Sequence, residues 1–156
     1  MAYLDIISLD DAKTYLGVDD SSRDDEITQM IKAALSFIER KTNHIMDAAD
    51  KDYILRDGCA RVYDYPINTL DADLDDSVTR TNKATYSIYE DTSTAKIITL
   101  NVGGTTIPND LIQAGYLLVE HFFAEKETGN NNFSLDTTRF PVAAMQIIDN
   151  NKRFIL

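Results

Sequence analysis

The carboxylates that could do chemistry do not match a catalytic or metal-binding pattern. The stretch DADLDD at residues 71–76 places acids at alternate positions, as a calcium-binding loop does. Such a loop also needs glycine at its sixth position and glutamate at its twelfth, where this chain has Asp76 and Asn82. A solvated acidic loop is therefore favoured over a calcium site. Glu39 and Glu120 are single helical acids that we expect to pair with nearby Lys or Arg side chains.

The histidines, the cysteine and the paired glycines are equally uninformative about catalysis. His44 and His121 are the only histidines, and neither has a second ligand at HxxxH or HExxH spacing. Cys59 is the only cysteine, and its small and apolar neighbours favour an inert buried thiol. The pair at 103–104 lacks the GK[ST] of a phosphate loop and predicts a turn. We predict no catalytic residue, no metal site and no cofactor.

The charge of the chain excludes further classes. Its 156 residues include 26 acidic and 15 basic side chains, a formal net charge of −11 that is opposite to that of a DNA-binding domain. The acids are dense in residues 1–26 and 64–91. They could form an ordinary solvated surface or a surface that repels a polyanion. We see no signal peptide and no membrane-spanning run, so we expect a cytoplasmic protein with no membrane partner.

The elements that must position these residues are helices at both ends of one predicted domain, residues 1–156, with strands between them. Helical periodicity, Ser8 as an N-cap and Gly17 as a stop predict helices at about 8–16, 24–42, 108–127 and 141–150. Alternating apolar and β-branched residues predict an antiparallel β region inserted at about 53–102, in which 71–82 is an exposed connection. The expected fold is mainly α (α+β), a small bundle of about four helices with this β insertion.

The helix predicted at 108–127 has more apolar surface than one core face requires. A core stripe at helical spacing is formed by Leu111, Ala114, Leu118 and Phe122. A second set of apolar residues widens this stripe: Ile112, Tyr116, Val119 and Phe123. Either the strand region buries the whole helix within one subunit, or part of the second set contacts another subunit.

The order of these elements resembles that of the tailed-phage head–tail connector (adaptor, or head-completion) proteins. The first two helices are similar to the family's opening at Leu9, Ala12, Lys13 and Leu16, then Ala34, Ile38, Glu39 and Thr42. Three later matches follow in the family's order: Tyr65-Pro66-Ile67, Pro108 leading into AGYLLVEHFFAEKE, and Pro141 to Arg153. The resemblance spans nearly the whole chain. Lys126 stands where the family has a basic residue, and the 71–100 region is longer and more acidic than usual.

The resemblance implies a non-enzymatic structural protein of a bacteriophage virion, made in the host cytoplasm and located at the neck. There it would form a ring oligomer, expected as a dodecamer, that completes the filled head and conducts DNA without binding it specifically. Its partners would be the portal protein, neighbouring copies of itself, and a tail or stopper protein. The second apolar set (Ile112, Tyr116, Val119, Phe123) would form part of the subunit interface.

Two charged segments would have separate roles in such a ring. Asp73, Asp75 and Asp76 would face the DNA channel, where carboxylates repel phosphates. The C-terminal tail, which combines two basic and three apolar residues, would dock on the portal: Lys152, Arg153, Phe154, Ile155 and Leu156. An alternative from another class is an acidic DNA-mimic inhibitor of a host nucleic-acid enzyme, acting as a monomer or dimer.

Overall fold

The computed structural model describes residues 3–70, 74, 76–83, 86–91, 95–104, 107–128 and 139–152. These residues form two compact units. The helical unit lies within Met1–Thr42 and Ile107–Lys152, and the β unit lies within Asn43–Thr106. Each unit has its own core, and we describe each separately. That the chain acts as a single domain stays a prediction.

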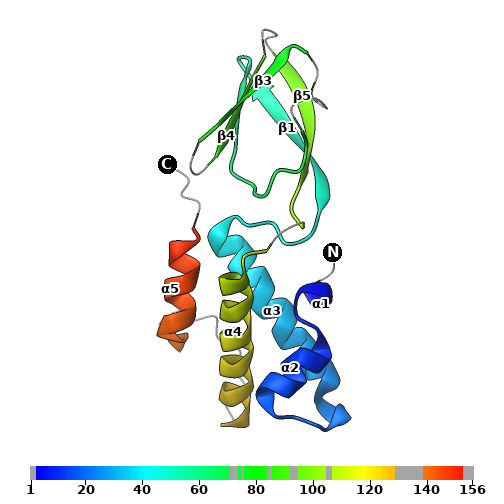
Figure 1. Ribbon diagram of the computed structural model, residues 1–156, viewed down its shortest axis with the longest axis vertical. Helices are drawn as coiled ribbons and strands as arrows, with labels where there is room; N and C mark the ends of the chain where they lie inside the picture. Colours follow the sequence, from blue (N-terminus) through cyan, green and yellow to red (C-terminus); the bar gives the residue numbers. More distant parts are fainter. Residues whose placement is uncertain are drawn as a thin grey trace. The chain divides into compact units, whose positions relative to one another are not determined.

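The helical unit contains the predicted helices, close to their expected bounds (Figure 1). Its elements are α1 (Tyr3–Ile6), α2 (Leu9–Leu16), the 3-10 turn η1 (Ser21–Arg23), α3 (Asp24–Thr42), α4 (Asn109–Glu127) and α5 (Val142–Asn150). Local chemistry sets the ends of α2. The Ser8 hydroxyl accepts a hydrogen bond from the Asp11 amide at 3.1 Å, and Gly17 ends the helix at φ 68°.

The core of the helical unit lies where α3, α4 and α5 pack side by side (Figure 1). The apolar stripe of α3 includes Ile31 and Leu35, and α4 contributes Leu111 and Leu118, all fully buried. α4 approaches its neighbours closely at Gly115, where an added Cβ would lie 2.8 Å from Cδ1 of Ile7. Within the described part of the chain, no helix is long and apolar enough to cross a membrane.

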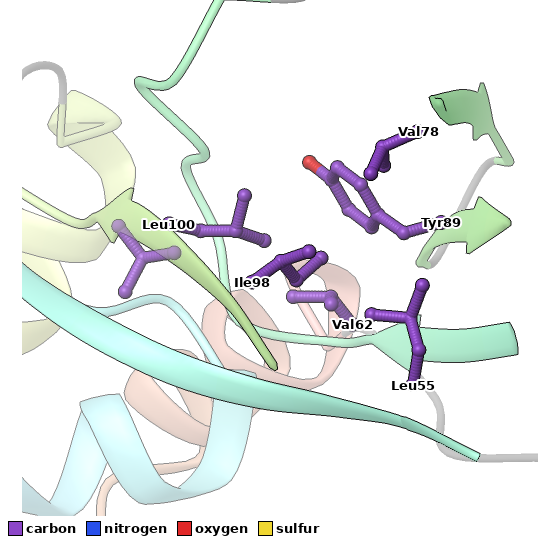
Figure 2. Close-up of a cluster of buried hydrophobic side chains, with 7 residues drawn as sticks. Leu55, Val62, Val78, Tyr89, Ile98 and Leu100 are labelled. Atoms are coloured by element: carbon purple, nitrogen blue, oxygen red, sulfur yellow. The ribbon is translucent and has the colours of Figure 1, made fainter. Parts of the chain in front are cut away.

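The β unit is a five-stranded antiparallel sheet in the order β3-β4-β2-β1-β5. Its strands are β1 (Ala49–Arg56), β2 (Cys59–Val62), β3 (Val78–Asn82), β4 (Ser87–Asp91) and β5 (Ala95–Val102). One face carries a buried cluster that draws on every strand: Leu55, Val62, Val78, Tyr89, Ile98, Leu100 and Val102. Figure 2 shows the labelled side chains of this cluster pointing toward one another, so that the sheet curls around its own core.

The segment after β2 helps to close this curl. Residues 66–69 run along the outer edge of β5, where the Asn68 amide donates to the Asn101 carbonyl at 2.8 Å and the Gly103 amide donates to the Pro66 carbonyl at 2.7 Å. On the other side, Nη1 of Arg80 in β3 donates to the Thr69 carbonyl at 3.0 Å. The two edge strands are therefore joined through this segment, which protects backbone groups that an open sheet would expose.

The predicted fold class is wrong in its main point. The protein is not a helical bundle with a β insertion but a mixed α+β protein, because the strands build a complete curled sheet with its own core. The prediction that 71–82 is an exposed connection is wrong for residues 78–82, which form β3. Only Val78 in that strand is buried. The largely polar sequence VTRTN therefore gave a weak strand signal. The strand is stabilised by its pairing with β4.

Candidate functional site

The side chains that could do chemistry are dispersed and have structural contacts. Among the described residues, no three His, Cys, Asp or Glu side chains are grouped to hold a metal ion. The two single acids of the helical unit pair with tyrosines rather than with Lys or Arg: Tyr3 donates to Glu39 at 2.6 Å, and Tyr15 donates to Glu120 at 3.3 Å. Cys59 is half-buried rather than fully buried. Surfaces, rather than a catalytic cleft, are therefore the candidate sites.

The widened apolar face of α4 is partly covered within its own unit. Val119 is fully buried, so it belongs to the core of the subunit. The ring of Tyr116 packs against Tyr15 of α2, with ring centroids 5.0 Å apart. Ile112 is half-buried. Of these four side chains, three remain partly accessible in one copy of the chain: Ile112, Tyr116 and Phe123.

Phe123 lies under a charged cluster. The Arg23 guanidinium lies 4.1 Å from the Phe123 ring centroid, and its Nε lies 3.1 Å from Glu26. Arg23 also pairs with Glu127, and Lys126 pairs with Glu26 at 2.6 Å. Hydrogen bonds from Arg23 and then from Lys126 lower the pKa of Glu26 below its ordinary value of 4.5. The cluster ties η1 and α3 to the end of α4.

The predicted channel and docking residues are only partly described. Asp76 is exposed in the turn before β3. Lys152 is half-buried and pairs with Asp149, one turn earlier in the chain. Asp73, Asp75 and residues 153–156 lie outside the described residues, and their proposed roles stay predictions.

The outer face of the β unit carries an apolar pair that the sequence analysis missed. Ile54 of β1 and Ile97 of β5 are directly paired across the two strands, and their side chains are 57% and 62% exposed. Sequence alternation could have found them, because each neighbours a buried residue of opposite orientation, Leu55 and Ile98. Two isoleucines side by side on a water-facing sheet make this pair a candidate contact surface.

A small pocket opens in the β unit, and we call it the basic pocket. It has a volume of about 250 Å³ and is lined by Tyr65, Ile67, Arg80, Asn82, Lys83 and Ser87. The Ser87 hydroxyl donates a hydrogen bond to the Asn82 side chain at 2.8 Å, and the backbone amide of Lys83 donates to the Tyr86 carbonyl at 2.8 Å. The sequence analysis missed this pocket because Arg80 belongs to the stretch 71–82 that was predicted to be a connection, and Lys83 follows it directly.

Comparison with known proteins identifies relatives over nearly the full length. The family described as "Head completion protein" matches residues 5–154. A search of curated proteins returned no match. A chain of the "Neck of empty GTA particle computed with C6 symmetry" has a TM-score of 0.70 and 13% identity, covering 97% of this chain and 92% of that chain. A chain of the "Virion of native gene transfer agent (GTA) particle" has a TM-score of 0.69 and 14% identity, with the same coverage. Identities this low show a shared fold.

Proposed function

Because the chain belongs to the head completion protein family, we propose that it forms a ring in the neck of a phage-like particle, between the portal and the tail. Family membership makes the chain a structural protein of such a particle. The proposed ring completes the filled head and lets DNA pass. The observation that carries this proposal is the family match over residues 5–154, nearly the full length of the chain.

The fold likeness supports the ring. One of the similar chains belongs to a particle neck computed with C6 symmetry, in which copies related by the sixfold axis are equivalent. A subunit in a closed ring makes heterologous contacts, so two different surfaces of each copy must meet. This chain offers the partly accessible side chains Ile112, Tyr116 and Phe123 on α4 and the exposed pair Ile54–Ile97 on the β unit. We assign both surfaces to contacts with neighbouring copies or neck proteins.

The acidity of the chain supports the passage of DNA. A net charge of −11 disfavours binding to phosphates, and a lumen that conducts DNA must not retain it. Asp73, Asp75 and Asp76 are our candidates for acids that face the lumen. The proposed tail contact with the portal uses Lys152, Arg153, Phe154, Ile155 and Leu156, whose basic and apolar side chains contrast with the acidic remainder.

The test is to measure the mass of the pure protein by light scattering, alone and after addition of DNA-filled heads that carry the portal. We expect a monomer or weak oligomer alone, and a ring of defined copy number on the heads, visible by electron microscopy. A tight dimer that does not bind heads would contradict the proposal. That result would instead favour the acidic DNA mimic, which binding of the dimer to a host nucleic-acid enzyme would then establish.

A further inference from the structure

The outward-facing residues of β1 change from acidic to apolar to basic along the strand. Every second residue of β1 shares the outer face of the sheet, and four of these are exposed: Asp50, Asp52, Ile54 and Arg56. Successive members of this row lie about 7 Å apart along the strand. Ile97 of β5 is directly paired with Ile54, so the apolar position of the row is two residues wide. An apolar pair is therefore flanked by carboxylates on one side and by a guanidinium on the other.

The two carboxylates of the row are hydrogen-bonded to neutral side chains. Asp50 accepts a hydrogen bond from the Asn101 side-chain amide, and Asp52 accepts one from the Thr99 hydroxyl, each at 2.7 Å. Lys51 lies between them in the strand, but it faces the other side of the sheet and pairs with Asp64 at 3.0 Å. Within the described part of the chain, neither carboxylate is in an ion pair.

Arg56, at the other end of the row, is exposed and lies far from those carboxylates. It is paired in register with Cys59 of β2, and Cys59 is paired with Glu90 of β4, so the acid in this row of the sheet is two strands away. Among the described residues, none forms an ion pair with Arg56. A partner that offers the reverse order of charges around an apolar centre is complementary to this face.

We propose that the outer face of β1 and β5 binds the same face of a second copy about a two-fold axis while the protein is free. If the axis crosses the strands at Ile54, the two β1 strands run antiparallel. Ile54 then meets Ile54 of the partner subunit, and Arg56 meets Asp52 of the partner subunit. Each copy supplies both halves of the contact, as an isologous interface requires.

The direction of the axis follows from the charges. A two-fold axis along the strands would instead stack β1 on β5 of the partner subunit. Asp52 would then lie opposite Thr99 of the partner subunit, because these two positions are paired within one copy, and the charges would not be matched. The axis across the strands brings opposite charges together twice and keeps the isoleucines in the centre, where an interface is most apolar.

This inference goes beyond the proposed ring and does not rest on it. Neighbours around a closed ring are related by rotation about the ring axis, so a two-fold pair is not a ring contact. The pair covers Ile54 and Ile97 before assembly and must separate before that face makes the contacts proposed in the neck. A contact of a few side chains is small, so we expect it to be weak and readily reversed.

The first experiment is sedimentation velocity of the pure protein at increasing concentration, up to the millimolar range. We expect the mass to rise from that of a monomer toward that of a dimer, to stop there, and to return on dilution. A protein that stays monomeric throughout would overturn the inference. Growth beyond the dimer would also overturn it, because a two-fold contact closes on itself.

The second experiment exchanges the charges of the proposed ion pair. Arg56→Asp places like charges opposite each other twice in the dimer, and so does Asp52→Arg. Each variant alone should dimerise about tenfold or more weakly than the wild type. In an equimolar mixture, the new carboxylate at position 56 faces the new guanidinium at position 52, and the two original groups face each other. The mixture should therefore regain dimers.

Circular dichroism checks that both variants are folded. The matched control is Lys32→Asp, the same change of charge at an exposed position of α3, which should dimerise as the wild type does. A mixture that dimerises no better than either variant alone would overturn the inference, and so would an equal loss in Lys32→Asp. Ring assembly on filled heads is scored separately. Its failure would contradict the proposed function and leave the two-fold pair standing.

Discussion

The guanidinium of Arg23 lies over the ring of Phe123, 4.1 Å from its centroid, although the two residues are far apart in the sequence. This contact explains how a helix with an unusually wide apolar face is tolerated in a small acidic protein. Arg23 covers the aromatic ring with its planar group and holds two carboxylates, Glu26 and Glu127. A residue that looked free for a subunit contact is therefore partly occupied within its own subunit.

Replacing Arg23 with Ala should lower the free energy of unfolding by about 1–2 kcal/mol, because the cation–π contact and the paired carboxylates are lost together. Urea denaturation followed by circular dichroism measures this change. Arg40→Ala is the control, since Arg40 is exposed on α3, the helix that follows Arg23. Equal stability of the two variants would show that the Arg23 cluster contributes nothing measurable.

The pH dependence of stability should report Glu26. Arg23 and Lys126 lower its pKa in the folded state, so its contribution to stability is present above about pH 4.5 and is lost as the pH falls through the folded-state pKa. Glu26→Gln should therefore lose about 1 kcal/mol at pH 7, and the difference from the wild type should disappear in acid. Thermal unfolding between neutral and acidic pH tests this. Asp25→Asn, an exposed change in the same turn, should show no such convergence.

Two glycines with left-handed backbone should respond differently to alanine. At Gly103, φ is 95° and an added Cβ would lie 2.6 Å from the Asp47 carbonyl oxygen, whereas at Gly17, φ is 68° and nothing lies within 4 Å. Gly17→Ala should cost about 1–2 kcal/mol for the backbone conformation alone. Gly103→Ala adds a backbone clash and should cost clearly more. Urea unfolding of the two variants measures the loss of unfolding free energy. A smaller loss for Gly103→Ala than for Gly17→Ala would contradict the close approach of Gly103 to the Asp47 carbonyl oxygen.

Ile97 and Ile98 are neighbours in β5 but face opposite sides of the sheet, so substituting each one tests a different role. Ile97 is 62% exposed and Ile98 is 6% exposed. Ile97→Thr should change the stability by less than about 0.5 kcal/mol but weaken assembly on heads. Ile98→Thr buries a hydroxyl in the apolar cluster and should cost about 2 kcal/mol or more. Unchanged assembly of Ile97→Thr would show that the Ile54–Ile97 pair is not a contact surface.

Deleting residues 152–156 should leave a folded protein, because the buried residues of α5, Ala144 and Ile148, precede the deletion. Attachment to heads should be abolished if the tail docks on the portal. Replacing Phe154 and Ile155 with Ala should weaken attachment more than neutralising Lys152 and Arg153, since apolar anchors usually contribute more than rim charges. Co-sedimentation with filled heads and circular dichroism check these outcomes. A folded, truncated chain that still binds would place the anchor elsewhere.

The helices were the most predictable part of the fold, because their signals are local. A capping residue such as Ser8, a stop signal such as Gly17 and the apolar periodicity of α3 each depend on residues only a few positions apart. The observed ends of α2, α3, α4 and α5 accordingly lie within one residue of the expected bounds. The polar strand β3 was not predicted, because its pairing with β4 is not visible in its own residues. The complete sheet was missed for the same reason.

The sequence by itself determined the charge of the chain, the positions of the main helices and the order of elements on which the family resemblance depends. These features are encoded in residue type and short-range spacing. Only the tertiary structure decided that the strands curl around a separate core, that Arg23 covers Phe123, and that Ile54 and Ile97 face solvent side by side. It also decided that Tyr65, Arg80 and Lys83 share one pocket, because such groupings depend on strand register and chain closure between distant segments.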